Sequence, residues 1–168
     1  TGEAVTDAEG NEITTSEIFV AEEKDGSIDI TFKFDASALA GKSLVAFETL
    51  YTEGKEVAIH ADLEDEGQTI RIPEIHTTAT DKVTGDHDGV VAKETTVLDE
   101  VFYTNLIPGK EYTVSGKLMV KETGEPLTVD GKEVTAEKTF VAEEVDGSII
   151  LEFTFDSSAL AGKKIDRK

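Results

Sequence analysis

The sequence has no cysteine and no tryptophan, and it contains only three prolines and three tyrosines in 168 residues. Without cysteine the chain forms no disulfide, no thiolate zinc site and no cysteine nucleophile. With so few large aromatic side chains it offers little surface on which a sugar could stack. No apolar run approaches the ~20 residues of a membrane-spanning helix, so we expect no membrane insertion.

Positive charge is also scarce. The chain has 16 Lys and Arg residues against 36 Asp and Glu, a formal net charge of -20 at pH 7. A polyanion is repelled by nucleic acid and by anionic membrane surfaces, so we expect neither as a partner. The acids are interspersed with apolar residues, which make up 38% of the chain and favour a folded core over disorder.

Several segments recur at a spacing of 121 residues. The repeated pairs are SALAGK at Ser37 and Ser158, FVAEEKDGSI at Phe19 with FVAEEVDGSI at Phe140, and ITFKFD at Ile30 with LEFTFD at Leu151. A period this long corresponds to a whole domain in a tandem array rather than to a solenoid unit. The chain therefore looks like a fragment that begins within one repeat and stops within the next.

Hydrophobic residues alternate with polar ones, which predicts strands. In SIDITFKFD, residues 27–35, the apolar side chains of Ile28, Ile30, Phe32 and Phe34 are expected to face inward. EYTVSGKLMV, residues 111–120, is expected to place Tyr112, Val114, Gly116 and Leu118 on one face. Short strands separated by Asp-Gly, Glu-Gly and Pro-Gly turns predict an all-β fold, an immunoglobulin-like antiparallel β-sandwich in tandem repeats.

The domain boundary is expected near Pro73, because proline cannot continue a central strand. We therefore predict that residues 1–72 form the C-terminal part of one repeat and residues 73–168 the N-terminal part of the next. The end of the chain departs from the repeat: Lys164 and Ile165 match the positions of Ser43 and Leu44, but Asp166 replaces the expected valine.

Two acids interrupt apolar, strand-like runs. Glu48 lies in LVAFETLY, residues 44–51, and Asp99 lies in TVLDEVFYTNL, residues 96–106. Buried carboxylates are rare unless they are paired, so both are candidates for chemistry. An acid that simply faces solvent is the alternative for each.

The segment between these runs holds further candidates, each with an ordinary explanation. Gln68 follows Gly67 in an acidic loop, where a solvated side chain is expected. Thr77 and Thr78 fit a strand through β-propensity alone. His60 alternates with apolar residues and could be a neutral, hydrogen-bonded histidine.

Taken together, these motifs resemble a known family. VAFETLY followed by EVAIHADLEDEGQT, residues 56–69, resembles the VaFE-type repeat of Gram-positive surface proteins, the Thr–Gln ester-bond domain. PEIHTTATD, residues 73–81, and VLDEVFYTNL, residues 97–106, resemble the opening of the next such repeat. In that family a Thr on the first strand bonds to a Gln on the last strand, and an Asp, a Glu and a His assist.

The resemblance implies a role for each candidate residue. The crosslink residues are the nucleophile Thr77, with Thr78 as the fallback, and the acyl donor Gln68. The catalytic residues are Glu48, His60 and Asp99. A histidine suits the task of activating a hydroxyl, and two carboxyls held close together keep one proton that can stabilise an oxyanion. Ammonia leaves, and the product is an ester formed in a single turnover, not by an enzyme with repeated turnover and without any cofactor.

The order of the motifs departs from the family, because Gln68 here precedes Thr77. The resemblance places the first and last strands side by side in parallel, and parallel neighbours need a crossover of roughly a dozen residues. Eight residues separate the pair, with Pro73 among them. We therefore predict that the N-terminal part of one chain completes the C-terminal part of the next by strand donation, with one copy of the repeated middle section left over.

The function that the resemblance implies is structural. We expect an extracellular stalk domain of a cell-wall-anchored adhesin or fibre, whose partners are neighbouring repeats or identical chains arranged head-to-tail. The alternatives are an adhesin module that binds a host glycan or protein without a crosslink, a hydrolase using Thr77, His60 and Asp99, and an engineered pair of ester-forming fragments.

No metal site is expected. The acidic segment 81–94 suggests a calcium loop, but Asp86, Asp88 and Gly89 do not fit the spacing of an EF-hand. His76 and His87 do not have the spacing of a closed zinc site, so we interpret both as surface residues.

Overall fold

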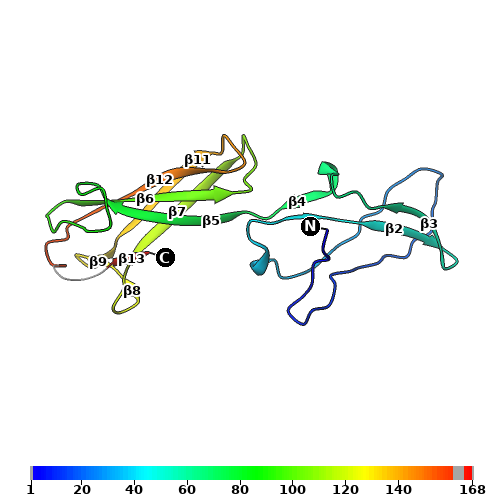
Figure 1. The fold of residues 1–168 in the computed structure, drawn as a ribbon, viewed down its shortest axis with the longest axis horizontal. Coiled ribbons are helices and arrows are strands. Elements are labelled where there is room, and N and C mark those ends of the chain that lie inside the picture. The colour runs from blue at the N-terminus through cyan, green and yellow to red at the C-terminus, as the bar shows by residue number, and fades with distance from the viewer. Residues whose placement is uncertain (1, 161–164, 168) are drawn as a thin grey trace. The chain divides into compact units, whose positions relative to one another are not determined.

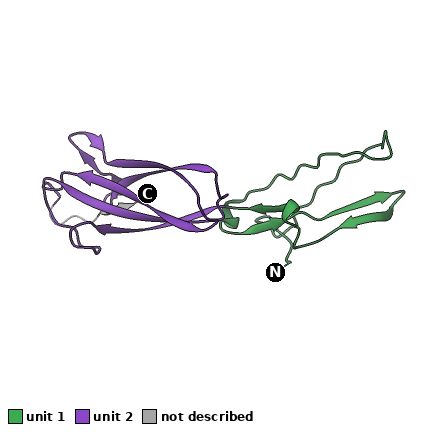
Figure 2. Cartoon of the chain, turned by 90° about the horizontal axis from the view of Figure 1, so that it is seen from above, with its two compact units in different colours: residues 1–72 green, residues 73–168 purple. Residues whose placement is uncertain are grey.

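The computed structural model describes residues 2–160 and 165–167, and it divides the chain into two compact units. Unit 1 comprises residues 1–72 and unit 2 comprises residues 73–168 (Figure 2). The division falls between Ile72 and Pro73, where the sequence places the boundary. Apart from two single-turn 3-10 helices, every regular element in the described residues is a β-strand.

Unit 1 contains two small antiparallel strand pairs. Its elements are η1 (Ser37–Leu39), β1 (Ser43–Val45), β2 (Glu48–Thr52), β3 (Lys55–His60), η2 (Glu66–Gln68) and β4 (Thr69–Arg71). Strand β1 pairs with β4, and β2 pairs with β3 through a tight turn. Glu53 and Gly54 form that turn with positive φ angles of 49° and 74°, the conformation that a two-residue hairpin requires. The predicted run 44–51 is therefore split into β1 and β2.

One strand prediction is wrong in unit 1. Residues 27–35 form no strand, and Ile28, Ile30, Phe32 and Phe34 are 37–43% exposed instead of facing a core. The matching segment of unit 2 does form a strand, and there Leu151, Phe153 and Phe155 are 1–7% exposed. The two segments differ in strand pairing. Residues 147–155 of unit 2 pair with residues 95–104, and the described part of unit 1 has no strand equivalent to residues 95–104.

Unit 2 is built around two facing sheets (Figure 1). Its strands are β5 (Glu74–Asp81), β6 (Thr95–Thr104), β7 (Glu111–Val120), β8 (Glu125–Pro126), β9 (Thr128–Val129), β10 (Lys132–Glu133), β11 (Thr135–Val141), β12 (Gly147–Phe155) and β13 (Ile165–Arg167). One of these sheets has the order β12-β6-β5, and the other has the order β11-β7-β13 with β8 also paired to β7. Strands β9 and β10 form a separate pair, and all pairings are antiparallel. The fold is thus the predicted immunoglobulin-like antiparallel β-sandwich.

The core of unit 2 lies between these sheets. Val101 of β6, Leu118 of β7 and Phe153 of β12 are each 1–3% exposed and pack in one cluster. Complete burial of such a side chain contributes about 1.5–3 kcal/mol, so a handful of them can hold the two sheets together without a disulfide. Val114 packs against the same cluster as Leu118, in agreement with the prediction that the two share one face of their strand.

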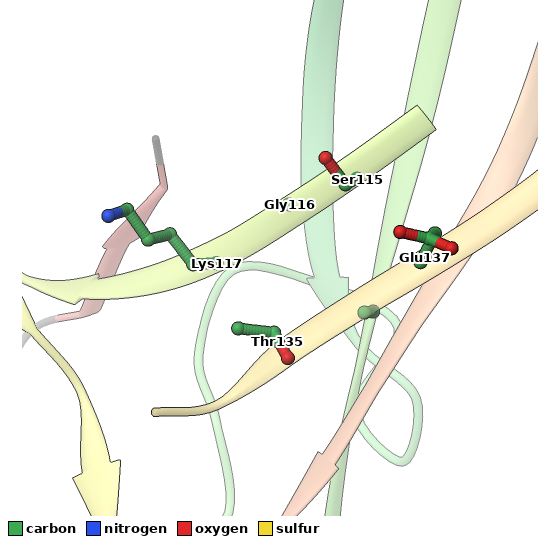
Figure 3. A pocket seen from close by; sticks show the side chains of 6 residues that line it. Ser115, Gly116, Lys117, Thr135 and Glu137 are labelled. Carbon is green, nitrogen blue, oxygen red and sulfur yellow. The ribbon is translucent and has the colours of Figure 1, made fainter. Parts of the chain in front are cut away.

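Gly116 of β7 is required by this packing. A Cβ atom at Gly116 would lie 2.9 Å from Cζ of Phe153 and 3.1 Å from Cδ2 of Leu151. Gly116 also lines a hollow over β7 and β11 (Figure 3). Its lining residues are Ser115, Gly116, Lys117, Thr135, Ala136 and Glu137. None of them was a sequence candidate for chemistry, and we assign the hollow no role.

Candidate functional site

Gln68 is positioned by the short helical turn η2. Oδ1 of Asp65 accepts a hydrogen bond of 2.8 Å from the backbone N–H of Gly67 and so caps the start of this turn. The backbone carbonyl of Asp65 accepts a second bond, 2.8 Å long, from the hydroxyl of Thr69. Gln68 ends η2 and is followed at once by β4, so its backbone is fixed on both sides.

The side chain of Gln68 contacts Glu48, the first residue of β2. Nε2 of Gln68 donates a hydrogen bond of 2.7 Å to Oε2 of Glu48, and the contact is partly buried. Oε1 of Gln68 is buried and has no hydrogen-bond partner among the described residues. A buried polar atom without a hydrogen-bond partner costs about 1–3 kcal/mol of stability. A hydrogen-bond donor from outside the described part of unit 1 would therefore stabilise this carbonyl oxygen.

His60 lies beside the same acid. Glu48 and His60 are directly opposed partners in the β2–β3 pairing. Nε2 of His60 lies 3.0 Å from Oδ2 of Asp65, and the side chain is half exposed. Three of the five sequence candidates, Glu48, His60 and Gln68, are thus grouped in unit 1.

Asp65 belongs to this group, and the sequence analysis missed it. One of its carboxylate oxygens caps η2 before Gln68, and the other contacts His60. The signal in the sequence was an acid three residues before the glutamine, at the position of a turn cap. Four acids crowd residues 62–66, so the pattern did not single out this one.

The other two candidates lie in unit 2. Thr77 of β5 is opposite Val101 of β6, and Ala79 is opposite Asp99. Cross-strand partners point to the same side of a sheet, so Thr77 and Asp99 are diagonal neighbours on the core face. Asp99 is 5% exposed and Thr77 is half-buried. Thr78, the fallback nucleophile, is exposed on the opposite face.

The predicted proton sharing between Glu48 and Asp99 concerns an assembled domain that contains both halves. Within unit 1, Glu48 contacts the nitrogen of the Gln68 amide and not its oxygen. The hydrogen bond therefore places Glu48 on the nitrogen side of the amide. A donor for the carbonyl oxygen has to come from elsewhere, and Asp99 remains the predicted source.

The acidic segment 81–94 is organised by Asp81, which is 4% exposed. Its carboxylate accepts hydrogen bonds of 2.8, 3.1 and 3.2 Å from the backbone N–H groups of Val83, Thr84 and Val90. Burial acts to raise the pKa of Asp81, but the three donors outweigh it and hold the pKa below its ordinary value. The loop is thus built around a carboxylate that binds its own backbone.

The remaining histidines are exposed, in line with the sequence analysis. His76 stacks on Phe102 with ring centroids 5.0 Å apart, and Nδ1 of His87 lies 2.8 Å from the carbonyl oxygen of Ala79. In the part of the chain that the structure describes, no three His, Asp or Glu side chains are grouped to hold a metal ion. No helix in that part is long and apolar enough to cross a membrane.

The structure thus combines an all-β sandwich, with Thr77 and Asp99 on its core face, and a unit in which the Gln68 amide is hydrogen-bonded to Glu48. The model of the T-Q ester bond containing domain family matches residues 1–72 and again residues 73–165, so the chain belongs to this family. Domains of this family occur in surface proteins and contain an ester crosslink. The VaFE subtype stays a prediction. Searches of curated proteins and of solved structures found no match.

Proposed function

We propose that this chain is a structural stalk segment of an extracellular surface adhesin or fibre, locked by an autocatalytic ester between Thr77 and Gln68. The observation that carries the proposal is the state of the Gln68 amide. Its nitrogen is bound to Glu48, and its carbonyl oxygen is buried without a partner among the described residues. This arrangement suits an acyl donor whose carbonyl carbon is attacked by a nucleophile and whose carbonyl oxygen then accepts a hydrogen bond from another group.

In the proposed reaction the hydroxyl oxygen of Thr77 attacks the carboxamide carbon of Gln68. His60, oriented by Asp65, accepts the hydroxyl proton as the C–O bond forms. Negative charge then develops on Oε1, where Asp99 is the proposed hydrogen-bonding partner.

Collapse of this intermediate breaks the bond between carbon and Nε2 of Gln68. The proton held by His60 passes to the nitrogen, which leaves as ammonia while Glu48 holds it in position. The products are one ester and one ammonia, and no oxidant, metal or cofactor takes part. Fixed proximity of the two side chains contributes up to ~7–11 kcal/mol toward the barrier, and burial protects the ester from water.

The ester is proposed to join two chains. Strands β4 and β5 are separated only by Ile72 and Pro73, which is far too short for a crossover between parallel neighbours. Gln68 of one chain therefore meets Thr77 of the next. Such a head-to-tail contact uses different surfaces on the two copies, so it builds a fibre, or a ring if the geometry closes.

An ester between the first and last strands of an assembled domain gives a stalk its mechanical role. A pulling force passes through the covalent bond and bypasses the sheets. Resistance to unfolding is then kinetic and does not depend on a deep core. This accounts for a surface domain that has no disulfide.

Intact mass spectrometry under denaturing conditions tests the proposal. The parent chain is expected to lose one ammonia for each ester formed, and Thr77→Ala and Gln68→Ala are each expected to abolish the loss. Thr78→Ala is the matched control, because this neighbouring hydroxyl lies on the exposed face of the same strand. Loss of ammonia from the Gln68→Ala chain, or an unchanged mass in the parent chain, contradicts the proposed ester.

A further inference from the structure

Strands β13 and β1 are the same element of the repeat. SALAGK precedes both, at residues 37–42 and 158–163, so Ile165 corresponds to Leu44 and Asp166 to Val45. Their sequences then differ, because β1 continues into VAFE and β13 into DRK. One chain therefore contains two versions of this strand, and each version pairs with a different neighbour.

Each pairing is well defined. Strand β13 runs antiparallel to the end of β7, with Ile165 opposite Val120 and Asp166 opposite Met119. Strand β1 runs antiparallel to β4, with Leu44 opposite Ile70. Among the described strands, β1 has β4 as its single neighbour, so its second edge is open.

The open edge of β1 carries the backbone groups of Val45. At the two ends of the β1–β4 pair, Ile72 N–H donates to the carbonyl of Lys42 at 2.8 Å and Ala46 N–H donates to the carbonyl of Gln68 at 3.3 Å. Before the strand begins, Gly41 N–H also donates to the carbonyl of Ile72 at 3.0 Å. Lys42 and Ala46, and Leu44 between them, therefore face β4. Since alternate residues of a strand direct their backbone groups to opposite edges, Val45 faces the open side.

The edge of β7 that β13 covers has the matching alternation. Leu118 bonds on the other side, donating to Val134 at 3.0 Å and accepting from Leu127 at 2.8 Å. Met119 therefore faces β13, where its partner is Asp166. Because Asp166 corresponds to Val45, a β1 strand placed in the register of β13 would present Val45 to Met119 with its β4 edge still paired.

We propose that the edge of β7 at residues 118–120 is the docking site for β1 of a second copy of this chain, and that β13 is a placeholder that leaves when the second copy binds. The inference rests on the proposed head-to-tail assembly. It adds the surface through which that assembly begins, and it implies that β13 slows association while it occupies this edge. Docking of β1 brings β4, and with it Gln68, into the same sheet as β7.

The two versions of the strand are unequal competitors. Both strands are described over three residues, and β13 has an aspartate at the position where β1 has the strand-favouring valine. Strand β1 arrives already paired with β4, so it adds two strands to the sheet where β13 adds one. Among the described strands β13 pairs with β7 alone, and a short edge strand opens at low free-energy cost, which allows the exchange.

Docking can be measured without the ester in a Gln68→Ala background. Asp166→Pro removes the N–H that faces Met119, so we expect it to weaken the placeholder and tighten self-association about tenfold by sedimentation or light scattering. Deletion of residues 164–168 is expected to have the same effect. Val45→Pro removes the matching N–H of β1 while leaving the bonds to β4, and it is expected to weaken association at least tenfold.

Hydrogen exchange at the Met119 amide provides a second measurement in the same chains. In dilute Asp166→Pro protein this amide should lose protection, and it should regain protection as the concentration rises. Equal association constants for the parent, Asp166→Pro and Val45→Pro chains, each with native circular dichroism, would overturn the docking proposal. That result is distinguishable from failure of the ester, which is the absence of ammonia loss in the parent chain.

Discussion

Gln68 and Glu48, 20 residues apart in the sequence, are joined by a hydrogen bond of 2.7 Å from Nε2 to Oε2, while Oε1 of the same amide is buried without a partner among the described residues. The bond fixes which end of the amide faces the acid. The nitrogen is directed to a carboxylate that can hold a departing ammonia, and the carbonyl is left for a different donor. The two ends of one side chain thus have separate environments in unit 1.

The first prediction concerns this contact. Glu48→Gln preserves the size of the side chain but removes the carboxylate that accepts from Nε2, so we expect ester formation to slow by about 10²-fold or more. The measurement is the time course of ammonia release. Glu64→Gln is the control, because Glu64 is an exposed acid in the loop that precedes Gln68. Equal slowing in both variants would show that only the net charge matters.

The second prediction concerns Asp65, which the structure adds to the site. Asp65→Asn keeps an oxygen that can cap η2 but removes the charge beside His60, so we expect crosslinking to slow about tenfold with little change in melting temperature. Asp65→Ala loses both contacts. In addition to slower crosslinking, we expect the free energy of unfolding to fall by about 0.5–2 kcal/mol, the value of a lost cap. Equal rates for Asp65→Asn and the parent chain would remove Asp65 from the mechanism.

The third prediction concerns the core of unit 2. Gly116→Ala places a methyl group 2.9 Å from Phe153, so we expect a loss of about 1–3 kcal/mol in the free energy of unfolding by urea. Gly26→Ala is the control, because a Cβ atom at Gly26 meets nothing within 4 Å. An unchanged urea midpoint for Gly116→Ala would show that Phe153 relaxes without cost.

The fourth prediction concerns acid stability. The pKa of Asp81 lies below its ordinary value in the folded chain, because the backbone donors outweigh burial. The stabilisation is therefore fully present above about pH 3.9, the ordinary value, and is lost as the pH falls through the lowered folded pKa. We expect Asp81→Asn to flatten the dependence of urea stability on pH below about 4. A slope that is unchanged by the substitution would assign acid sensitivity to other carboxylates.

The contrast between the two copies of one motif shows what the sequence could not predict. SIDITFKFD alternates strictly and SIILEFTFD less strictly, yet only the second forms a strand, because β6 lies beside it. Alternation of apolar and polar residues indicates which side chains could face a core. Whether the segment forms a strand against that core depends on a neighbouring strand with which it can pair. The unit boundary at Pro73 and the turn at Glu53 and Gly54 could be predicted, because each depends on local backbone geometry.

The same distinction applies to the site. The positions of Glu48, His60 and Gln68 in the motifs led to their selection, and β2–β3 pairing together with η2 brings them together. The register of β5 against β6 places Thr77 on the core face with Asp99 and Thr78 on the other, which the Thr-Thr pair alone could not decide. Asp65 was not selected because its role depends on two contacts, one with Gly67 and one with His60. The sequence alone does not distinguish it from the other acids of the same loop.

The central claim, an ester between Gln68 of one chain and Thr77 of another, is tested most directly by mixing two variants. A Thr77→Ala chain retains the acyl donor, and a Gln68→Ala chain retains the nucleophile, so neither can crosslink to its own kind. We predict that each variant alone remains a monomer on a denaturing gel. An equimolar mixture should give a covalent dimer one ammonia lighter than the sum of its chains. A mixture that stays monomeric, while the parent chain loses one ammonia and also runs as a monomer, would contradict the account.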